Sequence, residues 1–138
     1  MKCAVFLSKK TDDWATPKFI YEQTKGMFDP CPINATFDGL KIEWQKRNFV
    51  NPPYSQLLKW IEKSIEENNK GKEVILLIPA RTDTKAFKKL YDHGAKFLFI
   101  TGRLKFNEAN AAPFPSMLVC LNKGKREFAL IDRKEIKL

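Results

Sequence analysis

The sequence has little of the chemistry that hydrolytic and metal sites need. It contains one histidine, His93, and three cysteines that are widely spaced and form no C-x-x-C pair. Neither a disulfide framework nor a zinc site is therefore expected, and this cysteine usage favours a reducing compartment. His93 stands beside Gly94 at the end of a helical pattern, where it caps the helix or faces solvent. Any catalysis must therefore rest on positioning and electrostatics.

Long apolar runs, repeats and low-complexity segments are also missing. No stretch of about 18 apolar residues and no signal-peptide core is present, so no membrane association is expected. With 138 residues and 43% hydrophobic content, the chain is long enough for one core but short for two. The sequence therefore predicts a single domain over residues 1–138.

Positive charge is abundant. Lys and Arg together number 25 against 16 Asp and Glu, which gives a net charge of +9 and a pI near 9.5. This balance favours a polyanionic partner, with nucleic acid first. Because the basic residues are spread along the chain, a set of merely solvated lysine-rich faces remains the alternative.

Helical and strand patterns alternate along the chain, which predicts a doubly wound α/β domain with a mostly parallel sheet. Helices are expected from Thr16-Pro17 to about Gly26, from about Ser55 to Asn69, and after a Thr84 cap. Strands are expected at Met27-Phe28, Arg47 to Val50, Glu73 to Ile78 and Lys96 to Ile100. Ser116 to Leu121 and Glu127 to Ile131, separated by a turn signal, are expected to form a C-terminal antiparallel hairpin.

The tetrapeptide Asn51-Pro52-Pro53-Tyr54 follows a predicted strand directly and leads into a helix. Its two prolines fix φ and remove two backbone donors, so the loop presents carbonyl oxygens and an amide in a stiff arrangement. A planar amino group has two hydrogens, which the Asn51 oxygen and the Pro52 carbonyl can accept while Tyr54 offers a flat face. The loop thus suits methyl transfer to an amine. The alternative is an ordinary strand end with Tyr54 partly in the core.

Arg81 and Asp83 follow the predicted strand Glu73 to Ile78 at its carboxyl end, where α/β sheets bind ligands. Arg81 can pair with a phosphate or with Asp83. In the second case the two residues merely shape the loop, so both interpretations stay open.

Six motifs in order give the chain a resemblance to a known family. It resembles the phage-type, Dam-like DNA N6-adenine methyltransferases, which use S-adenosylmethionine. The motifs are residues 12–17 (DDWATP), 29–31 (DPC), 51–54 (NPPY), 77–84 (LIPARTDT), 102–106 (GRLKF) and 112–116 (APFPS).

The resemblance implies a Rossmann-like class I methyltransferase fold and assigns residues to the site. Asn51, Pro52, Pro53 and Tyr54 form the catalytic loop. The cofactor-binding residues are Thr16, Pro17, Asp29, Cys31 and Asp38. Asp29 would lie near the positive end of the cofactor, and Asp38 near its ribose. Residues 32–35 (PINA) stand where the wider superfamily has a Gly-x-Gly turn.

Substrate contacts are expected from residues at the same edge. Arg81 and Asp83 are candidates. Arg103 and Lys105 are candidates for phosphates, since basic residues beside aromatic ones suit an unstacked strand. Phe106 or Phe114 is expected to stack on a flipped base opposite Tyr54. The basic turn at residues 123–126 (KGKR) is a further candidate for DNA contact.

The resemblance implies methylation of adenine N6 in double-stranded DNA, with the target base flipped out. The alternatives are methylation of a base amine in RNA and a non-catalytic nucleic-acid-binding relative. No separate target-recognition domain is expected, so recognition is short, degenerate or shared between the subunits of a homodimer. A phage or viral origin is implied too, and with it the host cytoplasm.

Overall fold

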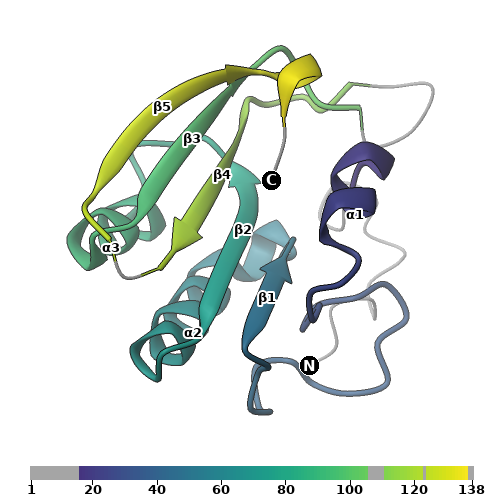
Figure 1. Ribbon diagram of the computed structural model, residues 1–138, viewed down its shortest axis with the longest axis vertical. Coiled ribbons are helices and arrows are strands. Elements are labelled where there is room, and N and C mark those ends of the chain that lie inside the picture. The colour runs from purple at the N-terminus through teal and green to yellow at the C-terminus, as the bar shows by residue number, and fades with distance from the viewer. Residues whose placement is uncertain (1–15, 106–110, 123, 137–138) are drawn as a thin grey trace.

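The computed structural model describes residues 16–105, 111–122 and 124–136. These residues form an α/β fold in which helices pack against one five-stranded sheet (Figure 1). The helices are α1 (Lys18–Thr24), α2 (Leu57–Asn69) and α3 (Lys85–His93), with short 3₁₀ helices η1 (Tyr54–Gln56) and η2 (Arg133–Glu135). The strands are β1 (Arg47–Val50), β2 (Glu73–Pro79), β3 (Lys96–Thr101), β4 (Ser116–Leu121) and β5 (Glu127–Asp132).

The helix signals read from the sequence are confirmed. Thr84 caps α3, because its Oγ1 accepts a hydrogen bond from the Phe87 N–H at 3.1 Å. Gly94 ends the same helix in a left-handed conformation with φ of 87°. The short strand expected at Met27-Phe28 is a single parallel bridge between Phe28 and Asn48 of β1. Within the described residues, no helix combines the length and the apolar character that a membrane span requires.

The sheet is mixed, so the prediction of a mostly parallel sheet is wrong. Its strand order is β1-β2-β4-β3-β5. The outer pairs, β1 with β2 and β3 with β5, are parallel, whereas β4 is antiparallel to both of its neighbours. Strand β4 thus joins two parallel pairs of strands.

The predicted C-terminal hairpin is also wrong. Strands β4 and β5 are consecutive in the chain, but β3 lies between them and pairs with both. The reason is that β2 and β3 occupy the two edges of β4, whose residues are almost all buried. Strand β5 is largely exposed and takes the remaining free edge of β3. A turn signal in sequence indicates a reversal of the chain, not which strand the returning segment will pair with.

The carboxyl ends of four strands lie at one edge of the sheet. We call it the carboxyl edge, because β1, β2, β3 and β5 all end there and β4 begins there. Pro79 at the end of β2 is opposite Ser116 at the start of β4, and Thr101 at the end of β3 is opposite Asp132 at the end of β5. Ligands of open α/β sheets bind at an edge of this kind. Figure 1 shows β4 running against its neighbours.

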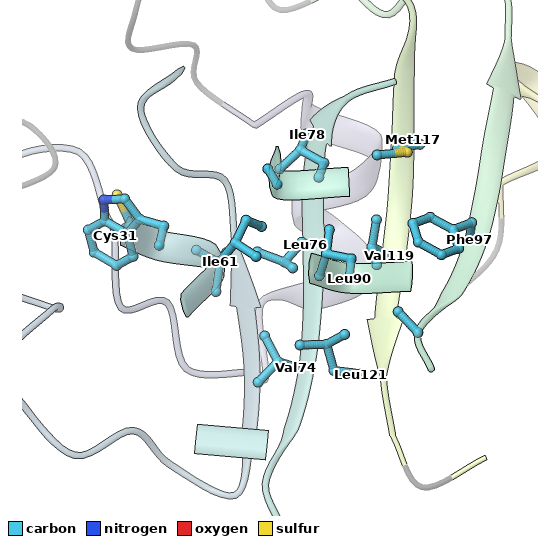
Figure 2. Packing of buried hydrophobic residues seen from close by; sticks show 14 of the residues in the cluster. Cys31, Ile61, Val74, Leu76, Ile78, Leu90, Phe97, Met117, Val119 and Leu121 are labelled. Atoms are coloured by element: carbon cyan, nitrogen blue, oxygen red, sulfur yellow. The ribbon is translucent and has the colours of Figure 1, made fainter. Parts of the chain in front are cut away.

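Alternate residues of β2 face two separate cores. Leu76 and Ile78 pack with buried residues of α2 and α3, whereas Leu77 packs with Ile20 of α1 on the other face. Figure 2 shows Ile61 of α2 and Leu90 of α3 lying against Leu76 and Val119 of the central strands. The buried sheet therefore holds the carboxyl edge on a rigid base.

The long segment between Phe28 and β1 is tied to α2 by Trp44 and Glu67. The Trp44 indole N–H donates to the Gly39 carbonyl at 2.7 Å, and its backbone N–H donates to Glu67 Oε1 at 2.9 Å. Its ring stacks on Trp60 with centroids 6.3 Å apart. These contacts hold an otherwise irregular segment against the sheet.

Glu67 is a fully buried carboxylate that binds three lysines. Its oxygens lie 3.2 Å from Lys63 Nζ, 3.0 Å from Lys70 Nζ and 2.5 Å from Lys72 Nζ. Burial raises the pKa of Glu67, but hydrogen bonds from Lys72, the Trp44 N–H, Lys70 and Lys63 outweigh burial and lower the pKa to about 2. Glu67 is therefore ionised at neutral pH and compensates the lysines around it.

Candidate active site

The proline loop lies at the carboxyl edge, where β1 ends. Asn51, Pro52 and Pro53 are buried, and Tyr54 begins η1 with a partly exposed side chain. Pro53 is extended, with φ of −66° and ψ of 136°. Because three successive residues are buried and two have a fixed φ, the loop is held rigidly at the end of the strand.

Thr16 lies beside this loop. The Asn51 side-chain N–H donates to Thr16 Oγ1 at 3.2 Å, across 35 positions of sequence. Pro17 follows as the N-terminal cap residue of α1, which is seven residues long. The contact joins a predicted cofactor residue to a predicted catalytic one.

A cavity of about 200 Å³ opens beside Thr16. Asp29 and Phe49 also line it, so two of the predicted cofactor residues share one cavity. Its other lining residues come from α1 and the segments that follow it: Tyr21, Thr24, Lys25, Met27 and Pro32. Cofactor sites commonly measure roughly 300–1,000 Å³, so this cavity suits one end of a cofactor.

The pKa of the Asp29 carboxyl is raised, although part of the side chain is exposed to solvent. The surrounding protein desolvates it and raises its pKa to about 6, although the hydrogen bond that Oδ1 accepts from the Cys31 N–H, at 2.8 Å, acts in the opposite direction. A neighbouring cation would favour the charged form and lower this pKa. Cys31 itself is buried in the core next to α2 and is disulfide-bonded, so the expectation that the cysteines form no disulfide is wrong and Cys31 offers no free thiol to a cofactor.

The segment after Asp29 turns without the usual glycines. Asn34 has φ of 60°, in the left-handed region that asparagine tolerates better than most residues. The predicted ribose ligand Asp38 uses Oδ1 to accept the Leu40 N–H at 3.0 Å. That bond is typical of an Asx turn, and it gives Asp38 a structural role whether or not it also binds a ligand.

Gly39 allows the close approach that this segment needs. A Cβ atom placed there would lie 1.9 Å from the Pro30 carbonyl oxygen and 2.9 Å from the Trp60 ring. We expect Gly39→Ala to destabilise the protein by about 1–3 kcal/mol, because backbone must move to relieve the contact. Urea unfolding measures this effect. Gly26→Ala is the matched control, since nothing lies within 4 Å of its added Cβ. Equal stability of the two variants would contradict the prediction.

A second cavity, of about 530 Å³, lies on the α2 and α3 side of the loop. Tyr54 forms part of its wall, and Arg81 and Lys85 provide positive charge. The remaining lining is Leu57, Leu58, Pro79, Thr84 and Ala86. An aromatic ring, an apolar floor and cations together suit a nucleotide, whose base is flat and whose phosphate is anionic.

Phe114 lies close to Tyr54 but does not leave a slot beside it. It is buried, and the two rings meet edge to face with centroids 5.0 Å apart. A base could stack between them only if the rings separated. Phe106, the other candidate for stacking, lies outside the described residues.

The remaining predicted substrate residues are at the carboxyl edge. Arg81 and Asp83 are both exposed and form no ion pair with each other. Arg103 and Lys105 follow β3. Arg103 Nη1 donates to the Ala112 carbonyl at 3.4 Å, and Lys105 forms an antiparallel bridge with Ala111.

Sequence reasoning missed several residues of the two cavities. Tyr21 and Lys25 lie on or just after a helix that carried no motif, so only their exposure on the folded α1 reveals them. Lys85 had a usable signal, because it directly follows the Thr84 cap after β2. Groups of three metal-ligating side chains are absent from the part of the chain that the structure describes.

The proline-rich loop thus lies where open α/β sheets bind ligands, with one cavity beside Thr16 and another beside Tyr54. Residues 33–133 match the family described as DNA N-6-adenine-methyltransferase (Dam). The chain belongs to this family of enzymes. The predicted family is thus confirmed.

No curated protein sequence matches the chain. Among solved structures, the crystal structure of a predicted O-methyltransferase from Agrobacterium tumefaciens is similar, with a TM-score of 0.38 and 21% identity. The similarity covers 78% of this chain and 50% of that one, so the chain spans about half the length of that protein. At this level the similarity carries no information about function.

Proposed function

We propose that this chain transfers a methyl group from S-adenosylmethionine to the N6 amino group of a flipped-out adenine in double-stranded DNA, as a single Rossmann-like domain in the cytoplasm. The observation that carries the proposal is the position of the proline loop between two cavities. Thr16, bonded to Asn51, lines one cavity, and Tyr54 lines the other. A loop between cofactor and acceptor is what direct transfer requires.

The smaller cavity suits the cationic end of the cofactor. Asp29 offers a carboxylate, Thr16 a hydroxyl, and Phe49 an apolar wall. The pKa of Asp29 is raised by desolvation, so a bound cation would stabilise its ionised form. When bound, S-adenosylmethionine supplies an electrophilic methyl group.

The residues of the loop act on the acceptor amine. The Asn51 side-chain oxygen and the Pro52 carbonyl accept its two hydrogens, which directs the nitrogen lone pair and stabilises the positive charge that develops on nitrogen. Tyr54 holds the adenine ring by stacking. A strong base is unnecessary, because the nitrogen loses its proton only after it has become cationic.

Labelled S-adenosylmethionine tests the proposal directly. The protein, made in a host without its own adenine methyltransferase, is incubated with unmethylated DNA, with RNA and with protein, and the methylated products are resolved. We expect N6-methyladenine in DNA. Label in RNA or protein alone would overturn the substrate. Absence of both labelling and cofactor binding would favour the non-catalytic alternative.

Cofactor affinity should depend on pH through Asp29. A cationic ligand favours the ionised carboxylate and lowers its pKa on binding, so affinity should fall as the pH drops through about 6 and protons compete with the cofactor. Calorimetry between about pH 5 and pH 7 measures this change below the range where an amino group titrates. The Asp29→Asn variant should bind more weakly, with little pH dependence. Parallel pH profiles in wild type and variant would contradict the role of Asp29.

A further inference from the structure

Four basic residues meet at one corner of the carboxyl edge. Arg103 and Lys105 follow β3, and Arg133 and Lys134 form the start of η2 after β5. The two segments start side by side, because Thr101 at the end of β3 is paired with Asp132 at the end of β5. We call these four residues the basic corner. In sequence they are about 30 positions apart, and only the parallel pairing of β3 and β5 brings them together.

The backbone of Gly102 gives the Arg133 side chain a defined position. A Cβ atom on Gly102 would lie 2.9 Å from Arg133 Cδ and 3.2 Å from its Nε, so the arginine passes directly over the glycine. Gly102 also has φ of 84°, which favours glycine. Arg133 is partly buried. An arginine held in this way loses less entropy on binding than one that is free in solvent.

In the part of the chain that the structure describes, carboxylates do not compensate the charges of the basic corner. Among the described residues, none of its four side chains lies within ion-pair distance of an acidic group. The neighbouring Asp132 has other partners, since Oδ1 accepts the Lys134 backbone N–H and Oδ2 lies 3.4 Å from Thr101 Oγ1. Glu135 is also nearby and exposed.

The opposite end of the sheet differs. There Lys63, Lys70 and Lys72 are paired with Glu67, and Arg47 with Glu73. The basic turn around Lys125 and Arg126 also lies at that end, because β4 runs away from the carboxyl edge. Arg126 donates to the Tyr91 carbonyl there. The turn predicted from sequence to touch DNA is therefore remote from the proline loop, whereas the basic corner shares its edge.

The distance between the proline loop and the basic corner matches a short length of DNA strand. Neighbouring strands lie about 4.8 Å apart, so β5 is roughly 19 Å from β1 across the four steps of the sheet. At about 3.4 Å per nucleotide along one strand, this corresponds to roughly five or six nucleotides. A duplex whose adenine reaches Asn51 would pass the basic corner with its flanking phosphates.

We infer that the basic corner, with Arg133 and Lys134 as the new members, binds phosphates of the DNA duplex on one side of the target adenine. The inference rests on the proposed function for the identity of its ligand. Unpaired arginine and lysine at the edge that carries the catalytic loop attract a polyanion without reading its sequence. The corner therefore supplies affinity and orientation.

Binding of a fluorescently labelled duplex, measured by anisotropy without cofactor, tests the inference. We expect the double variant Arg133→Gln, Lys134→Gln to bind roughly tenfold or more weakly at about 0.1 M salt, and the slope of log affinity against log salt to fall by about 1–2. The control is Lys88→Gln, Lys89→Gln on α3. It removes the same charge, but from lysines paired with Asp92 and Glu62. The variant Arg133→Lys should recover part of the loss.

Equal weakening in the two double variants would overturn the inference, because net charge alone would then explain the effect. Unchanged binding in the Arg133 and Lys134 variant, or a wild type that binds no duplex, would also overturn it. The outcome is separable from that of the proposed function. Duplex binding that needs the basic corner without any methylation would refute only the activity, and methylation with unaltered binding by the variant would refute only the corner.

Discussion

Replacing Asn51 by alanine is expected to lower the rate of methyl transfer by about 10²–10³-fold, the usual cost of removing one group that stabilises developing charge. Asn51 is buried at the end of β1, and its amide is oriented by the hydrogen bond to Thr16. Alanine removes both the oxygen that accepts from the amine and the bond that fixes it. The amine would still enter, but without alignment and with less compensation of its positive charge.

Single-turnover kinetics and cofactor calorimetry separate the two consequences. We expect the rate constant to fall by the amount given above while the cofactor dissociation constant changes by less than about tenfold, because Asp29 and Thr16 remain. Asn69→Ala is the matched control, since this asparagine is exposed at the end of α2. A rate within about tenfold of wild type would contradict the role of Asn51.

Replacing Glu67 by alanine should destabilise the fold by about 3–5 kcal/mol, because it leaves buried positive charge without its counter-ion. Lys63, with 10% of its side chain exposed, would lose the carboxylate it is paired with, whereas Lys72, with 15% exposed, would keep Glu43 at 3.2 Å. The Trp44 N–H would also lose its acceptor. The segment that carries Asp29 and Asp38 is anchored through this bond, so cofactor affinity should fall together with stability.

Urea unfolding at two pH values tests the prediction for Glu67. The pKa of Glu67 is lowered in the folded state, so its contribution is complete above the unfolded value near 4.5 and is lost as the pH falls toward about 2. The difference between wild type and variant should therefore shrink in acid. The neighbouring Glu66→Ala is the control, because Glu66 is exposed and its ion pair with Lys70 is long, at 4.0 Å. We expect it to cost less than about 0.5 kcal/mol. A comparable loss in both variants would contradict the assigned role.

The helices and strands could be predicted from sequence because their signals are local. Thr84 as a cap, Gly94 as a stop and the apolar run of β2 each act within a few residues. The pairing of strands is not local. The apolar sequence of β4 indicates a central strand with a neighbour on each side. It does not indicate that these neighbours are β2 and β3.

In the site, too, the residues of one motif could be predicted, whereas contacts between residues distant in sequence could not. Asn51 and Tyr54 stand in one motif whose chemistry can be read directly, and the structure places it at the carboxyl edge. The contact of Thr16 with Asn51 spans 35 positions, so residue chemistry alone could not reveal it. Arg133 and Lys134 carried no motif. Their proximity to Arg103 depends on the pairing of β3 with β5, which the expected hairpin did not include.

The central place of β4 has a consequence for how the chain reaches its native state. Strands β1 and β2 can pair as soon as both exist, but β3 finds its two neighbours, β4 and β5, only in later parts of the chain. The two halves of the sheet are joined by β4 alone. A growing chain thus cannot close the sheet until Leu121 has left the ribosome, and contacts this distant in sequence slow folding. Until then, the edge of β2 that pairs with β4 in the native sheet remains unpaired.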